Sequence, residues 1–209
     1  MRVGIILLIC ILALCNSKVF GQSIFEERKV IILDAGHGGI DSGTVSEDGL
    51  QEKDVVLDIA RSMVAWNKGL LESKYDIYLT RGKDTLISLN DRTKLVRFLR
   101  PDVFISLHCN HNDDSKIKGV EIYTYGQNEF SILLAQAISL GLNQKLGFKT
   151  RETKQANFQV LRETKEYCPS MLLELGYLSN ADESNYLENR KKRSALAYVI
   201  LTSIKLDKK

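Results

Sequence analysis

Residues 29–39 read Lys-Val-Ile-Ile-Leu-Asp-Ala-Gly-His-Gly-Gly. The nearly continuous apolar run from Lys29 to Asp34 is typical of a strand that is covered on both faces. The glycines that follow permit unusual backbone angles, so that the imidazole of His37 can be presented in an open cleft. This stretch predicts a buried strand that ends in a loop capable of chemistry.

Four further stretches have the same β-rich character, and they cover residues 75–80, 103–108, 119–124 and 170–175. Helical apolar stripes lie between them. The stripes are Val56, Ile59, Ala60 and Met63; Leu134, Ala137, Ile138 and Leu142; and Leu196, Val199 and Ile200. Ser88-x-x-Asp91 and Ser179-x-x-Asp182 resemble capping boxes that open helices. The alternation predicts a single α/β domain, with a mostly parallel or mixed central sheet flanked by helices on both faces.

The first residues have the layout of a secretory signal peptide. Arg2 supplies a positive start, residues 3–14 form an apolar run, and a more polar stretch ends at Gly21. The run is too short to span a bilayer. We assign residues 1–21 to a signal peptide and residues 22–209 to one folded domain, and we expect export to the periplasm or cell envelope. Cys15 closes a lipoprotein-like box, but the size of Leu14 disfavours lipidation there.

Composition and charge exclude two classes of protein. The chain is 44% hydrophobic and 26% charged, as in an ordinary globular domain. Loss of residues 1–21 removes two basic residues, Arg2 and Lys18, and no acid, so the formal charge falls from +3 to +1. This balance disfavours a nucleic-acid binder. No other long apolar run exists, so we expect no stable membrane span, and we expect a monomer.

Chemically capable residues stand at the ends of three predicted strands, where sites form in open α/β sheets. His37 follows the first strand, His108 closes the strand at 103–108, and Glu174 lies within the last one. Taken alone, His37 could be a surface turn residue and His108 a core histidine bonded to a carbonyl. Together they suggest a catalytic zinc, which takes three protein ligands, typically histidine and carboxylate, and one water.

The residues leave two questions open. Glu52 and Asp54 both stand near the start of the stripe at 56–63, and either could be the carboxylate ligand or a helix-start acid that complements the helix dipole. Glu174 is an acid inside an apolar strand, and a buried carboxylate without a partner is costly. Its partner could be Arg81 or a water activated by the metal.

Several motifs in order resemble the zinc-dependent N-acetylmuramoyl-L-alanine amidases of the amidase-3 type. The resemblance runs from about residue 29 to residue 206. Tyr177 stands where phenylalanine is usual in the family, and Cys109 where alanine is common. The motifs are Asp34-Ala-Gly-His37-Gly-Gly-x-Asp41-x-Gly43, Glu52-Lys-Asp54, Thr80-Arg81, Ser106-Leu-His108-x-Asn110 and Leu173-Glu174-x-Gly176-Tyr-Leu-Ser-Asn180.

The resemblance implies one zinc per chain, held by His37, Glu52 and His108. It implies that Glu174 takes a proton from the attacking water and returns it to the leaving amine. The implied bond is the amide between N-acetylmuramic acid and L-alanine in peptidoglycan; the alternative is another zinc peptidase, such as a carboxypeptidase acting on cell-wall peptides. Arg81 becomes structural and His111 a rim residue. No appended wall-binding domain is visible, so we expect recruitment by the domain itself or by a protein partner.

Two further expectations concern Cys109, Cys168 and the cleft. The cysteines form a disulfide or remain two buried thiols, and strand alternation directs Cys109 away from the face that His108 uses. Some relatives that act at division carry a long helical insertion that covers the zinc, after the strand matching 119–124. Here only residues 125–129 separate that strand from the next helix. This short connection predicts an open cleft without self-inhibition.

Overall fold

The computed structural model describes residues 28–206, and the predicted signal peptide, its cleavage site and Cys15 lie outside these residues. Six strands form one sheet in the order β2-β1-β3-β6-β4-β5. Neighbouring strands are parallel except β4 and β6, which are antiparallel. The sheet is therefore mixed. The strands are β1 (Lys29–Ala35), β2 (Tyr75–Leu79), β3 (Val103–Asn110), β4 (Glu121–Thr124), β5 (Lys154–Gln155) and β6 (Ser170–Tyr177).

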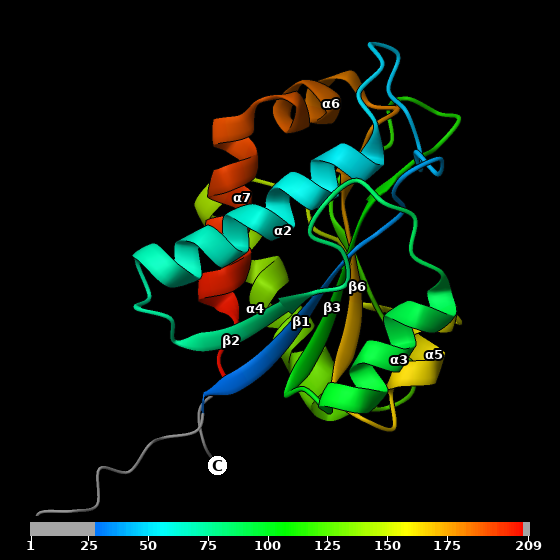
Figure 1. The fold of residues 1–209 in the computed structure, drawn as a ribbon. Helices are drawn as coiled ribbons and strands as arrows, with labels where there is room; N and C mark the ends of the chain where they lie inside the picture. The colour runs from blue at the N-terminus through cyan, green and yellow to red at the C-terminus, as the bar shows by residue number, and fades with distance from the viewer. Residues whose placement is uncertain (1–27, 207–209) are drawn as a thin grey trace, which may run out of the picture.

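Helices cover both faces of the sheet, as predicted (Figure 1). One layer contains α2, α4 and α7, with α6 beside them, and the other contains α3 and α5. The helices are α2 (Glu52–Gly69), α3 (Leu89–Leu99), α4 (Glu129–Leu146), α5 (Gln159–Thr164), α6 (Ala181–Glu188) and α7 (Arg190–Ser203). Within residues 28–206, no helix combines the length and the apolar character needed to cross a bilayer.

The continuous apolar strands divide their side chains between two cores. In β1, Ile31 and Leu33 pack into the larger core with α2 and α7, whereas Ile32 packs into the smaller core under α3 and α5. The same alternation runs through β3 and β6, because successive residues of a strand point to opposite faces. His108 and Glu174 therefore belong to the face of the smaller core, near the carboxyl ends of their strands.

One of the two predicted helix caps is confirmed, and the other is not. Ser88 is the N-cap of α3 and accepts a hydrogen bond from the amide of Asp91. The predicted cap at Ser179 is wrong, because Asn180 caps α6 and accepts from the amide of Glu183. The hydroxyl oxygen of Ser179 instead accepts from the amide of Asn112. Ser179 thereby ties the loop after β3 to the start of α6.

Two short elements and one stripe position escaped the prediction. The two-residue β5 and the six-residue α5 are too brief to produce a hydrophobic period. In α4, Ala135 is buried where the predicted stripe used Ala137, which is exposed. The connection between β4 and α4 is as short as expected and comprises residues 125–128.

Candidate metal centre

Three ligand-bearing side chains meet at the carboxyl edge of the sheet. His37 follows β1, His108 lies near the end of β3, and Glu52 is the first residue of α2. One ligand atom from each lies within 4.8 Å of the other two, so this His–Glu–His group could hold a metal ion. Asp54, the rival of Glu52, is exposed and does not belong to the group.

Glu52 is almost completely buried and uses both carboxylate oxygens. Its Oε1 lies 2.9 Å from Nδ1 of His108 and 3.1 Å from Nε2 of His37, and it accepts the amide of Cys109. Its Oε2 accepts the amide of Thr44 at 2.9 Å. These contacts fix the carboxylate between the two imidazoles, at the point where α2 meets the sheet edge.

His37 is held by partners on its ring and on its backbone. Its Nδ1 lies 2.9 Å from Oδ2 of Asp41, which leaves Nε2 facing Glu52. The residue has φ of 57°, a left-handed conformation that costs energy for a side chain other than glycine. The guanidinium of Arg92 donates to its carbonyl oxygen at 2.8 Å and holds the loop in this conformation. Sequence reasoning assigned no role to Asp41 or Arg92.

Two glycines leave the space that the ligands occupy. A Cβ atom on Gly36 would lie 2.3 Å from the ring of His108. A Cβ atom on Gly43 would lie 2.4 Å from Oε2 of Glu52 and 2.7 Å from the ring of His37. Gly43 also has φ of 64°, which favours glycine. The chain therefore packs its backbone directly against the ligand group.

Two buried arginines bind the backbone of the loop that follows β1. Arg92 forms an ion pair with Asp34, and both side chains are almost completely buried. Arg81 donates to the carbonyl oxygens of Ala35, Gly36 and Lys53. Arg81 has a structural role here, as the resemblance implied, and it is not the partner of Glu174.

The contacts within the ligand group change the pKa values of Glu52 and His37. Burial opposes the charge on Glu52, but contacts with His108 and His37 outweigh it and lower the pKa of Glu52 to about 2. The contact with Glu52 raises the pKa of His37 to about 8, against the opposing effect of burial. Without a metal, a cation on His37 and an anion on Glu52 stabilise each other.

Glu174 lies beside the ligand group but outside it. It pairs in register with His108 across β3 and β6. Its Oε2 is buried and has no hydrogen-bond partner among the described residues. Burial raises the pKa of Glu174 to about 7, opposed by His108 and reinforced by the charge of Glu52. A carboxyl group with this pKa can both accept and donate a proton near neutral pH.

Comparison with known proteins identifies the family. The family model described as N-acetylmuramoyl-L-alanine amidase matches residues 31–206. The chain belongs to this family. It is 33% identical over 179 residues to the probable cell wall amidase LytH of Staphylococcus epidermidis. That alignment covers 85% of this chain but 57% of the relative, so the chain spans less than two thirds of that relative's length.

Solved amidase structures have the same fold. The catalytic domain of CwlV, an N-acetylmuramoyl-L-alanine amidase from Bacillus (Paenibacillus) polymyxa var. colistinus, superposes with a TM-score of 0.77 at 33% identity. The match covers 84% of this chain and 95% of that domain. The CwlD amidase of Clostridioides difficile, solved in complex with the GerS lipoprotein, has a TM-score of 0.77 at 27% identity. Here 84% of this chain and 96% of CwlD are covered.

A cavity of about 540 Å³ opens beside the candidate metal centre of this amidase-family chain. His37, His108 and Glu174 line one side, and the other side is largely apolar. His111 is exposed and lies outside this cavity, with its Nδ1 3.2 Å from Oγ1 of Thr44, in keeping with a rim position. The apolar side consists of Leu86, Ile87, Leu89, Phe158, Val160 and Leu172.

The two cysteines of this amidase-family chain are buried thiols, the second of the two states expected from the sequence. Cys109 and Cys168 are both free and buried. Cys109 belongs to the larger core and Cys168 to the smaller one, so the sheet separates them. Burial raises the pKa of both thiols, and neither belongs to the candidate ligand group.

Proposed function

We propose that this protein is a zinc-dependent hydrolase that cleaves the amide bond between N-acetylmuramic acid and L-alanine in peptidoglycan. The observation that carries this proposal is the juxtaposition of His37, Glu52 and His108 with the unpartnered, buried oxygen of Glu174. Membership of the amidase family supports the choice of bond.

The ligand group fits zinc in chemistry and in size. Two imidazoles and one carboxylate are a usual donor set for catalytic zinc, which keeps a further position open. Ligand atoms about 2.1 Å from a tetrahedral metal lie about 3.4 Å apart. The contacts of Glu52 Oε1 with His108 and His37, at 2.9 and 3.1 Å, are close to this separation. Asp41 orients His37, as carboxylates commonly do for metal-binding histidines.

When bound, zinc supplies a Lewis acid that polarises the amide carbonyl and acidifies the attacking water. Glu174 contributes the proton transfer. Its free Oε2 accepts a proton from the water during attack, and the same carboxyl group then donates the proton to the leaving nitrogen of L-alanine. The raised pKa of Glu174, about 7, suits both steps near neutral pH.

The substrate determines where the protein acts. Peptidoglycan lies outside the cytoplasmic membrane, which agrees with our assignment of residues 1–21 to a signal peptide. We infer that the protein acts in the cell envelope or periplasm, as a monomer, and that either the domain itself or a partner protein directs it to its substrate. Lipidation at Cys15 is the alternative route to the envelope.

Digestion of purified peptidoglycan tests the proposal. The zinc-loaded protein should release peptides with a free L-alanine amino group and leave the sugars intact, as read by mass spectrometry. A chelator should abolish the reaction, and added zinc should restore it. Release of single amino acids from peptide ends would identify a carboxypeptidase instead, and cleavage that persists after complete metal removal would contradict the metal assignment.

A further inference from the structure

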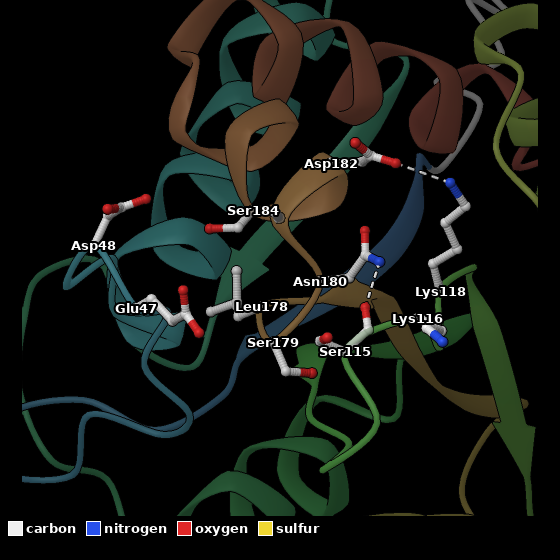
Figure 2. Close-up of a pocket in the computed structure, with 11 residues that line it drawn as sticks. Glu47, Asp48, Ser115, Lys116, Lys118, Leu178, Ser179, Asn180, Asp182 and Ser184 are labelled. Atoms are coloured by element: carbon white, nitrogen blue, oxygen red, sulfur yellow. Dashed lines mark hydrogen bonds and ion pairs between the residues drawn. The ribbon is translucent and has the colours of Figure 1, made fainter.

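A second pocket, of about 400 Å³, lies outside the candidate metal centre. Figure 2 shows Glu47 and Asp48 on one side of it and Lys116 and Lys118 on the other. Between them lies the segment from Leu178 to Asp182, at the start of α6. The walls of the pocket thus carry charges of opposite sign, and none of the proposed zinc ligands lines it.

Three of the charged groups in this pocket have no partner within the described residues. The carboxylates of Glu47 and Asp48 form no hydrogen bond or ion pair there, and neither does the ammonium group of Lys116. Lys118, in contrast, is paired with Asp182 at 2.9 Å. The amide of Asn180 is also engaged, because it donates to the carbonyl oxygen of Ser115. The fixed contacts shape the pocket, and the free charges remain available to a ligand.

Two chain segments connect this pocket to the metal centre. Glu47 and Asp48 lie in the loop of a hairpin whose base is Thr44 and Glu52, which exchange hydrogen bonds. Three extended residues span at most about 10 Å, so Glu47 lies within that distance of Thr44, measured between Cα atoms. The second segment is the loop after β3, which runs from His108 to the pocket and is tied to Ser179 through Asn112.

We propose that this pocket binds the third residue of the peptide stem, and that it recognises a side chain with both an ammonium and a carboxylate group. The inference rests on the proposed function, because that reaction places L-alanine, the first residue of the peptide stem, at the metal centre. The third residue lies two extended residues beyond L-alanine, roughly 7–10 Å away. This distance matches the separation of at most about 10 Å between Thr44, at the base of the hairpin, and Glu47 in its loop. Glu47 and Asp48 bind the ammonium group, and Lys116 binds the carboxylate.

Meso-diaminopimelate has this pair of groups at the end of its side chain, whereas L-lysine has the ammonium group alone. The two acidic residues therefore distinguish a tripeptide stem from a dipeptide stem. Lys116 distinguishes diaminopimelate from lysine. Each contact is exposed to solvent, so each contributes only a few-fold to recognition.

Turnover of three soluble substrates by the zinc-loaded protein tests the proposal. The substrates are N-acetylmuramic acid carrying L-Ala-γ-D-Glu, the same with meso-diaminopimelate added, and the same with L-lysine added. The double variant Glu47→Gln/Asp48→Ser should lower kcat/KM for both tripeptides on the order of five- to tenfold and leave the dipeptide unchanged. Lys116→Met should lower kcat/KM a few-fold for the diaminopimelate substrate alone. The matched controls are Lys68→Met, in the last turn of α2, and Glu72→Gln, in the loop that follows α2. Both lie at the end of α2 opposite to the pocket.

Equal kcat/KM for the dipeptide and both tripeptides in the native protein would overturn the proposal, as would variants that slow all three substrates alike. Failure to cleave any of them would contradict the proposed function instead. Binding of the free peptide L-Ala-γ-D-Glu-meso-diaminopimelate then tests, independently of turnover, whether the pocket recognises the third residue. Amide NMR signals of residues 46–49 and 115–118 should shift in the native protein and not in the double variant. Unchanged signals in the native protein would reject the site.

Discussion

Glu174 differs from Glu52 in having a carboxylate oxygen that no described residue satisfies. We therefore expect Glu174→Gln to keep zinc and to lose activity by about 10²–10⁴-fold, the usual contribution of a general acid–base group. Glutamine preserves the shape of the side chain and removes only the proton transfer. Zinc content by elemental analysis and kcat on a soluble muropeptide measure the two effects, with Glu72→Gln as the control. Turnover close to native would assign the proton transfer to another residue.

The protonation of His37 predicts how zinc binding depends on pH. The pKa of His37 is raised from 6.5 to about 8, so the metal-free protein holds a proton there that a metal must displace. Zinc affinity should therefore fall by about tenfold per unit as the pH decreases below 8. The same shift stabilises the metal-free fold below pH 6.5, and this contribution is lost as the pH rises through 8.

Competition with a chelating indicator at several pH values measures the affinity, and calorimetry in buffers of different ionisation enthalpy counts the released proton. The zinc-bound protein should lack the His37-linked change in stability, because the metal replaces the proton. An affinity that stays constant between pH 6.5 and 8 would contradict the assignment of His37 as a ligand.

The sequence alone identifies some of the site residues and leaves the role of others undecided. His37 and His108 are visible because each ends an apolar strand. Spacing alone cannot separate Glu52 from Asp54, because both stand in the first turn of α2; in the structure only Glu52 turns inward to the sheet edge. The role of Arg92 is not visible in the sequence, because Arg92 lies in α3 and its partner Asp34 lies in β1, far away in sequence.

Gly36, which directly follows β1, lies against the side chain of His108 near the end of β3. A Cβ atom at Gly36 would lie 2.3 Å from the ring of His108. Gly36→Ala should therefore displace this ring and weaken zinc binding by about 10- to 100-fold, as changes around metal ligands commonly do. Gly82→Ala is the matched control, because a Cβ there meets nothing within 4 Å. Native zinc affinity in Gly36→Ala would show that His108 is not a ligand.

Length decides which elements can be predicted from the sequence. β1, β3 and β6 are visible because each is a run of largely apolar residues buried on both faces, and β2 and β4 are visible as shorter β-rich runs. The antiparallel direction of β4 beside β6 cannot be read from such runs, since both directions produce the same buried pattern. The cap of α6 moves from Ser179 to Asn180 because a long-range contact with Asn112 engages the serine hydroxyl.

The sheet edge that carries the candidate metal centre also carries the connections that could cover it. The connection from β4 to α4 comprises residues 125–128. Four residues cannot form a helix that crosses the cleft. The segment between β3 and β4, residues 111–120, contains no helix or strand of its own. Neither connection supplies a helical cover for the cavity beside Glu174.

An uncovered cleft predicts activity without a partner protein. The purified, zinc-loaded protein should cleave soluble muropeptides at a rate that a second protein does not change, because neither of these two connections covers the cavity with a helix. A recruiting partner should change where the protein acts and leave its kcat on soluble substrate unaltered. Initial rates with and without cell-envelope extract measure this, and Glu174→Gln protein accounts for amidases in the extract. A zinc-loaded protein that is inert on every muropeptide until a second protein is added would contradict the prediction.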